Sequence, residues 1–332
     1  MTKTATKDLA LQVAGLNVRF KTLRGVVEAV SDVSFDLPSG SVLALVGESG
    51  SGKSVTAKSI MGLVRANHAE VSTRTLQLCG QDLKTMSEEG RRRLRGAQIA
   101  MVFQDALSAL NPVLSIADQL GELFRIHRQA SRREARERAI ELLRLVRIPN
   151  AEKRVDDYPH QFSGGMRQRL LIAAGIALKP QVLIADEPTT ALDVTVQAQI
   201  LDLLDELRSA MGMSVMIITH DLGVVARIAE EVAVMYGGRI VERAGVEEIF
   251  DAPRHPYTAA LLASAPRISS RARLTPIQGT TPVLINPKPG CAFAPRCAYA
   301  TPICVNERPL LTPDGAPHCY ACHHPMPEVE HA

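Results

Sequence analysis

The sequence SVLALVGESGSGKS, residues 41–54, joins a short apolar run to a glycine-rich loop. The run at 41–46 is compact and almost wholly apolar, as in a buried strand, and the residues that follow the loop up to Val64 have helical spacing. The stretch therefore predicts a strand, a tight loop and a helix in direct succession. Such units build α/β proteins around a parallel sheet.

The second half of the chain continues this alternation of strands and helices. Compact apolar runs occur at 182–185, 215–218 and 232–236, and helical patterns at 195–208 and 222–230 separate them. Residues 132–146 place apolar side chains on one stripe and Arg and Glu on the other face, which predicts an amphipathic helix. Buried strands between helices predict a mainly parallel α/β sheet.

Length and charge exclude several classes of protein. The 332 residues can bury one large core with an appendage, or two domains. Because Lys and Arg number 38 and Asp and Glu 35, the net charge of +3 gives no sign of a surface for nucleic acid or anionic membrane. The longest apolar stretch, 170–178, is about half of the roughly 18 residues that a membrane helix needs. Asp8 lies where a signal peptide would have its apolar core, so we expect a cytosolic protein.

The composition changes after about residue 265. Proline recurs, no long helical period is visible, and the segment has little apolar material for a core of its own. Five of the six cysteines lie here, namely Cys291, Cys297, Cys304, Cys319 and Cys322. In a reducing compartment this clustering favours a metal over disulfides, and four thiolates suit either an iron–sulfur cluster or Zn²⁺. The segment is therefore either a disordered tail or stapled through its cysteines, and we expect a metal to staple it.

The glycine-rich loop fits the phosphate-binding pattern, and it lies between a strand and a helix as that pattern requires. Its residues are Gly47, Glu48, Ser49, Gly50, Ser51, Gly52, Lys53 and Ser54. The glycines let successive backbone N–H groups turn toward phosphate oxygens, and the start of the helix adds positive potential. We expect Lys53 to reach the β- and γ-phosphates of a nucleotide and the Ser54 hydroxyl to ligate Mg²⁺.

Two carboxylates, Asp186 and Glu187, follow the apolar run at 182–185. An acidic pair after a strand is often a helix cap or a solvated loop. With a phosphate loop upstream, however, we expect Asp186 to lie in the Mg²⁺ shell and Glu187 to orient or deprotonate the attacking water. The chain is thus predicted to hydrolyse a nucleoside triphosphate.

A third element lies upstream of this acidic strand, the stretch FSGGM at 162–166. With the three motifs in this order, the sequence resembles ABC-family ATPases. Their signature loop, usually Leu-Ser-Gly-Gly-Gln, opens a helix whose amino terminus faces ATP bound to the opposite subunit. Ser163, Gly164 and Gly165 match the signature, whereas Phe162 and Met166 depart from its commonest form. The resemblance implies that these three residues contact the ATP held by a partner subunit.

Four further positions match the family pattern. Gln104 resembles the Q-loop glutamine, which touches Mg²⁺ and the attacking water beside a coupling helix of the membrane subunit. His220 resembles the switch histidine that contacts the γ-phosphate, and Asp193 the D-loop residue that crosses the dimer interface. Phe20 is a candidate for the aromatic that stacks on adenine, with a place in the core as the alternative.

The carboxy-terminal region narrows the resemblance to the ATPases of dipeptide and oligopeptide importers. Residues 255–258, His-Pro-Tyr-Thr, precede a short helical pattern and then the cysteine-rich segment, as in that subfamily. Some of its members bind a [4Fe–4S] cluster through cysteines that resemble Cys291, Cys297, Cys304 and Cys322. The intervals of five and six residues between the first three are wider than in typical zinc knuckles, and together with the resemblance this favours iron, with Zn²⁺ as the alternative. Cys319 is an additional candidate ligand.

The resemblance covers roughly residues 9–330. It implies an ABC-type P-loop ATPase domain at 9–265 with a helical subdomain at about 105–175, and a Pro- and Cys-rich extension at 266–332. ATP and Mg²⁺ are the implied cofactors, together with the [4Fe–4S] cluster.

The implied function is to power peptide import at the cytoplasmic face of the cell membrane. The implied partners are a second ATPase subunit, two membrane permeases and, indirectly, an extracytoplasmic peptide-binding protein, with no nucleic acid. A soluble ABC ATPase acting on DNA or ribosomes is the alternative from a different class. Import of nickel or glutathione is the alternative within the same class.

Overall fold

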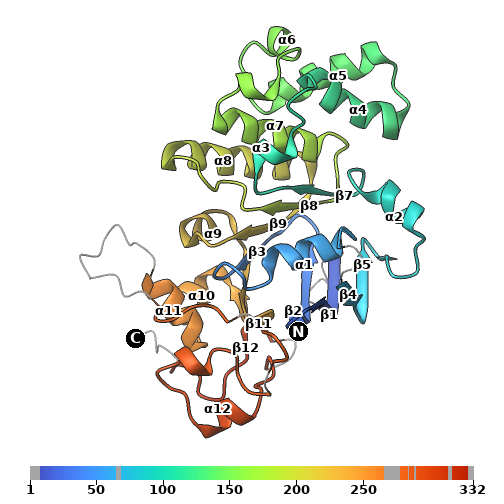
Figure 1. Ribbon diagram of the computed structural model, residues 1–332. Coiled ribbons are helices and arrows are strands. Elements are labelled where there is room, and N and C mark those ends of the chain that lie inside the picture. The colour runs from blue at the N-terminus through green and yellow to red at the C-terminus, as the bar shows by residue number, and fades with distance from the viewer. Residues whose placement is uncertain are drawn as a thin grey trace, which may run out of the picture. The chain divides into compact units, whose positions relative to one another are not determined.

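The computed structural model describes residues 8–64, 69–264, 277–282, 284–287, 289–312 and 316–327. The chain divides into two compact units (Figure 1). The first unit consists of residues 1–11, 37–41 and 77–217, and the second of residues 12–36, 42–76 and 218–332.

The first unit has an α/β core and a group of helices. Its elements are β6 (Gln81–Asp82), α2 (Glu88–Leu94), β7 (Ile99–Val102), α3 (Ala106–Ala109), α4 (Ile116–Arg128), α5 (Arg132–Leu145), α6 (Ala151–Arg154), the 3-10 helix η1 (Pro159–Gln161), α7 (Gly164–Ile176), β8 (Val182–Asp186), α8 (Val194–Met211) and most of β9 (Ser214–Thr219). The strands lie in the order β9, β8, β7, and β8 is parallel to β7. All residues of these three strands are buried, because both faces of the sheet are covered, as the continuous apolar runs predict.

Helices α4 and α5 pack against each other in this unit (Figure 1). Helix α5 begins at a capping box, in which Ser131 and Glu134 satisfy each other's backbone N–H groups. A Cβ at Gly121 of α4 would lie 3.3 Å from the Cβ of Ala135, so the glycine permits a close crossing of the two helices. The amphipathic helix predicted at 132–146 is confirmed, because α5 buries one apolar stripe and exposes Arg and Glu.

The second unit carries the phosphate-loop pattern and the carboxy-terminal extension. Its elements are β1 (Leu9–Thr22), β2 (Gly25–Pro38), β3 (Val42–Val46), α1 (Lys53–Ile60), β4 (Ala69–Ser72), β5 (Thr75–Leu78), α9 (Leu222–Ile228), β10 (Glu231–Tyr236), β11 (Arg239–Gly245), α10 (Val246–Asp251), α11 (Pro256–Ser264), the 3-10 helix η2 (Ala294–Arg296), α12 (Pro302–Asn306) and β12 (Cys319–Tyr320). Strands β1, β2 and β5 each extend by a few residues into the first unit.

Two sheets run through the second unit. In one, β3 is parallel to β10, and β10 is antiparallel to β11. In the other, the long strands β1 and β2 lie side by side, and β4 pairs with β1 in antiparallel fashion. The expected strand–loop–helix unit is confirmed as β3, the loop and α1, although α1 ends at Ile60 rather than Val64.

The described extension packs on the rest of the second unit instead of building a core of its own. Strand β12 adds to the edge of β11, with Arg243 opposite Cys319. Another extension segment lies along β2, where the Glu28 N–H donates to the Leu284 carbonyl at 3.0 Å. Phe293 is 3% exposed and packs against Tyr236 and Tyr257 of the ATPase part. Backbone pairing and an aromatic cluster shared with the ATPase part therefore order the described extension, in which β12 pairs with β11 and Phe293 packs on Tyr236 and Tyr257.

Candidate functional site

The loop between β3 and α1 closes around the ammonium group of Lys53. Its Nζ donates to the carbonyls of Gly47 at 2.7 Å and Glu48 at 2.9 Å, and it lies 3.4 Å from the Ser51 hydroxyl. Lys53 is only 5% exposed although it carries charge. The Lys53 ammonium group thus lies inside the loop, where the sequence pattern places a phosphate. Ser54, the expected Mg²⁺ ligand, follows in the first turn of α1.

Two of the loop glycines are required by close contacts with neighbouring strands. A Cβ at Gly47 would lie 2.2 Å from the Met235 carbonyl, and one at Gly52 would lie 2.4 Å from the Ala29 carbonyl. Both glycines also have positive φ angles, of 151° and 105°. The loop conformation is therefore open only to glycine at these two points.

In the first unit, the acidic pair lies at the end of β8, and its Glu187 contacts a glutamine that follows β7. The register of the parallel strands places Val102 opposite Ala185, so the residues two positions further along, Gln104 and Glu187, also come together. Gln104 Nε2 donates to Glu187 Oε2 at 2.8 Å, and Thr190 Oγ1 donates to the same oxygen at 2.8 Å. Asp186, the last residue of β8, is 2% exposed.

The stretch at 162–166 forms the start of α7. Ser163 is the N-cap residue, and its Oγ accepts from the Met166 N–H at 3.4 Å. A Cβ at Gly165 would lie 2.6 Å from Cγ1 of Val196 in α8, so this glycine permits the close approach of the two helices. A Cβ at Gly164 would meet Leu192 at 3.7 Å, which is ordinary contact.

The two departures from the usual signature sequence have structural roles here. Phe162 is 2% exposed, and the guanidinium carbon of Arg154 lies 4.0 Å from the centre of its ring. Arg154 Nη1 also lies 3.3 Å from Sδ of Met166. One arginine thus packs on both residues and supports the loop before α7.

The remaining sequence candidates lie at ends or edges of elements. Asp193 is the N-cap of α8, and its Oδ1 accepts from the Val196 N–H at 2.9 Å. His220 is exposed between β9 and α9. Phe20 lies in β1, half-buried and opposite Ala69 of β4.

Four cysteines of the extension line one small cavity of about 20 Å³, together with residues such as His255 and Phe293. They are Cys291, Cys297, Cys304 and Cys322. Burial raises the pKa of the Cys322 thiol to about 11 and also raises the pKa values of Cys291 and Cys297. Cys319 does not line this cavity, and its thiol lies 3.0 Å from the Ala316 carbonyl. Over the described ranges, no three His, Cys, Asp or Glu side chains are grouped to hold a single metal ion.

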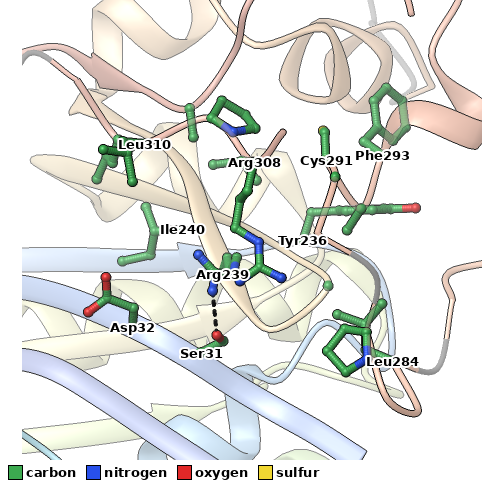
Figure 2. Close-up of a pocket in the computed structure, with 18 of the residues that line it drawn as sticks. Ser31, Asp32, Tyr236, Arg239, Ile240, Leu284, Cys291, Phe293, Arg308 and Leu310 are labelled. Carbon is green, nitrogen blue, oxygen red and sulfur yellow. Dashed lines mark hydrogen bonds between the residues drawn. The ribbon is translucent and has the colours of Figure 1, made fainter. Parts of the chain in front are cut away.

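A larger cavity of about 370 Å³ lies beside the first, between β11 and the extension (Figure 2). Arg239 and Arg308 reach into it, and Arg239 Nη2 donates to Ser31 Oγ at 2.6 Å. Burial, together with the positive charge of Arg308, lowers the pKa of Arg239. Cys291 and Phe293 line both cavities, so the cysteine cluster is continuous with this surface.

Sequence reasoning missed three residues that hold the phosphate loop. The Glu48 N–H donates to the Tyr257 hydroxyl at 2.9 Å, and the Glu48 carboxylate binds Arg296 and Thr281. Tyr257 falls in the quoted 255–258 stretch, and Arg296 adjoins Cys297, but neither pattern indicates a contact with residue 48.

In the part of the chain that the structure describes, no helix combines the length and apolar character needed to cross a membrane.

Comparison with known proteins identifies both parts of the chain. Residues 30–190 match the family described as ABC transporter, and residues 241–304 match the oligopeptide/dipeptide transporter C-terminal region. The dipeptide transport ATP-binding protein DppD of Bacillus subtilis is 49% identical over 98% of this chain and 97% of its own length. The oligopeptide transport ATP-binding protein OppD of the same organism is 48% identical, over 96% of this chain and 91% of its own.

A solved structure agrees with the fold. The dimeric ATP-binding cassette MJ0796, in a post-hydrolysis state bound to ADP and Pi, is 25% identical with a TM-score of 0.62, over 71% of this chain and 98% of that one. Relatives at nearly half identity span almost the whole sequence. The chain therefore belongs to the ABC transporter ATP-binding proteins of the dipeptide and oligopeptide family, which are ATPases.

Proposed function

We propose that this chain is the subunit whose ATP hydrolysis powers uptake of dipeptides or oligopeptides through an ABC transporter. One observation carries the proposal: the similarity to dipeptide and oligopeptide transport ATP-binding proteins is nearly full-length and includes the C-terminal region named for such transporters. Shared ATPase motifs alone would support any ABC protein, whereas this region supports a peptide transporter.

In the proposed ATP site, the loop from Gly47 to Ser54 binds the phosphates. Lys53 would exchange its loop carbonyls for the β- and γ-phosphates, and Ser54 and Asp186 would hold Mg²⁺, which would neutralise charge on the phosphoryl group. His220 contacts the γ-phosphate, and Phe20 stacks on the adenine. The burial of Lys53 inside the glycine-rich loop supports this assignment, because it holds the ammonium group where the sequence pattern places the phosphates.

Glu187 is the proposed general base for the attacking water. The amide of Gln104 and the hydroxyl of Thr190 both donate to Oε2 of its carboxylate. These two bonds fix the orientation of the carboxylate. A general base needs a fixed orientation to accept a proton from a positioned water. Gln104 is also a proposed Mg²⁺ ligand, so the glutamine would connect metal binding with the orientation of the base.

A second ATPase subunit, a copy of this chain or a paralogue, completes each site in the proposal. Ser163, Gly164 and Gly165 would contact the ATP of the partner, and Asp193 would cross the interface. Support comes from the related cassette, whose structure is dimeric and bound to ADP and Pi, and from the Ser163 cap, which presents the start of α7.

Attachment to the membrane would come from two permease subunits at its cytoplasmic face. The net charge of only +3 gives little electrostatic attraction to anionic lipid, so the permeases are the proposed anchor. Peptide would reach them from an extracytoplasmic binding protein that this chain does not touch.

The proposed prosthetic group is a [4Fe–4S] cluster held by Cys291, Cys297, Cys304 and Cys322. Two observations support it: the four thiols share one cavity, and Cys319 lies outside it. Bound there, the cluster would supply structural cross-linking or redox sensing. The chemistry of four thiolates also fits Zn²⁺, and the metal content of the purified protein distinguishes the two.

Co-purification from the native cell tests the proposed function. We expect the tagged chain to bring down two hydrophobic permeases and an ATPase partner. Recovery with ribosomes or DNA would instead favour the soluble ABC ATPases. Uptake assays on the recovered complex, with a labelled dipeptide, glutathione and nickel, then separate a peptide importer from an importer of the other two substrates.

A further inference from the structure

The carboxylate of Glu48, in the phosphate loop, is held by an arginine 248 residues further along the chain. Arg296 Nη1 donates to Oε2 at 2.6 Å and Nη2 donates to Oε1 at 3.1 Å, so the two planar groups pair through two bonds. Thr281 Oγ1 adds a third bond, to Oε2 at 2.9 Å. The arginine side chain is 6% exposed and the glutamate side chain 26% exposed. This is a sheltered pair, unlike the solvent-exposed ion pairs that contribute little.

Arg296 is itself fixed by the extension. Its Nε donates to the Gln278 carbonyl at 2.7 Å, and Nη1 lies 3.3 Å from the Tyr236 hydroxyl. Arg296 ends the 3-10 helix η2, and its backbone N–H bonds to the Phe293 carbonyl at 2.9 Å. This helix lies between Cys291 and Cys297 in the chain, so the guanidinium is positioned by the turn that joins two of the cavity cysteines.

A second contact reaches the same loop residue through an aromatic cluster. The Tyr257 hydroxyl accepts from the Glu48 N–H at 2.9 Å. The Tyr257 ring centre lies 4.6 Å from that of Tyr236 and 5.4 Å from that of Phe293. Figure 2 shows Tyr236, Phe293 and Cys291 together at one end of the larger cavity. Arg296 thus binds the side chain of Glu48, and Tyr257 binds its backbone. Phe293 of the extension packs against Tyr257, so the extension supports both contacts.

We propose that the extension positions the phosphate loop for ATP, with Arg296 as the positioning residue. The proposal rests on the assignment of residues 47–54 as the phosphate-binding loop. When the loop is already ordered, ATP binding does not have to supply the free energy that ordering costs. A preordered loop therefore has a higher affinity for its ligand. Arg296 also neutralises a carboxylate next to the site of a polyphosphate, where an unpaired negative charge would repel ATP.

This pairing has a consequence that a merely structural contact would lack. Arg296→Met removes the positive charge but keeps a long apolar side chain, and it leaves the Glu48 carboxylate without its guanidinium. Glu48→Gln combined with Arg296→Met removes both charges. If repulsion of ATP matters, the double variant binds ATP better than Arg296→Met alone, although it has lost more of the native contact.

The test measures the affinity of the full-length chain for a fluorescent ATP analogue, and the KM and kcat for ATP of the assembled transporter. For Arg296→Met we expect roughly tenfold weaker binding and a matching rise in KM, since charge-assisted bonds to a sheltered carboxylate are lost, with little change in kcat. Arg296→Lys keeps the charge and should recover part of the affinity. Arg308→Met, in the same extension but facing the larger cavity, is the matched control and should bind ATP as the native chain does.

Two results would overturn the proposal. One is native ATP affinity in Arg296→Met, which removes the positioning role. The other is a double variant that binds ATP no better than Arg296→Met when the melting temperatures of both variants equal that of the native chain, which removes the role of Arg296 in neutralising Glu48. Lys53→Ala separates this failure from failure of the loop assignment. Loss of ATP binding in Lys53→Ala with native binding in Arg296→Met refutes the positioning role alone. Native binding in Lys53→Ala refutes the loop assignment itself.

Discussion

Glu187 lies directly after the end of β8, which is parallel to β7. Strand β8 buries every residue up to Asp186, and the chain then turns at Glu187 with a positive φ of 48°. The neighbouring strand ends in register, so Gln104 is delivered to the same carboxylate. Sequence alone predicted both residues as catalytic candidates. Their direct contact and the second donor, Thr190, required the strand register.

The proposed base is tested by Glu187→Gln. The substitution preserves size and removes the proton acceptor, so ATP binding should persist while hydrolysis in the assembled transporter falls by at least about a hundredfold. Binding is measured with a fluorescent ATP analogue and turnover by phosphate release. Glu141→Gln, on the exposed face of α5, is the control and should leave turnover unchanged. Near-native turnover in Glu187→Gln would remove Glu187 from the role of base.

At the level of elements, local patterns carried most of the prediction. The runs at 182–185, 215–218 and 232–236 correspond to β8, β9 and β10, because buried parallel strands are apolar on both faces. Long-range pairs could not be foreseen in this way. The Arg296–Glu48 pair joins residues far apart in the sequence, and no periodicity in either segment encodes it. The length of β1 and β2 was also missed, since both strands mix polar and apolar residues without strict alternation.

Helix α7 is the element that should act on a partner's ATP. Ser163→Arg places a long cation at its start, so it should abolish ATP-driven dimer formation while the isolated chain keeps its nucleotide affinity. Ser131→Arg removes an equivalent cap from α5, and each loss of a cap costs about 0.5–2 kcal/mol of stability. Gel filtration with ATP should show dimer loss only for Ser163→Arg. Equal loss of nucleotide affinity in the isolated Ser163→Arg chain would mean that the loop acts on its own ATP.

The extension is the element that should hold the metal. Protein purified without oxygen should be brown, with a broad absorbance at about 400 nm and about four irons per chain. Substitution by Ser at Cys291, Cys297, Cys304 or Cys322 should bleach it, while Cys319→Ser should not, because its thiol lies outside the shared cavity. Colourless protein with one zinc per chain would contradict the cluster and support the alternative metal.

For the whole molecule, the two units carry different parts of the proposed chemistry. The second unit holds the phosphate loop, His220 and the extension, and the first holds Gln104, the acidic pair and the start of α7. Under the proposal, half of each composite site lies on another subunit, and permeases supply the transport path. The isolated chain should therefore be a poor ATPase, and should stay off lipid membranes at moderate salt.

The most direct test of ATP-driven peptide import uses proteoliposomes that contain the permeases, the chain and its ATPase partner. We predict ATP-dependent accumulation of a labelled dipeptide, ATP hydrolysis that rises when peptide-loaded binding protein is added, and loss of both when this chain carries Glu187→Gln. Hydrolysis by the chain alone that equals the rate of the assembled transporter and ignores peptide would contradict the account.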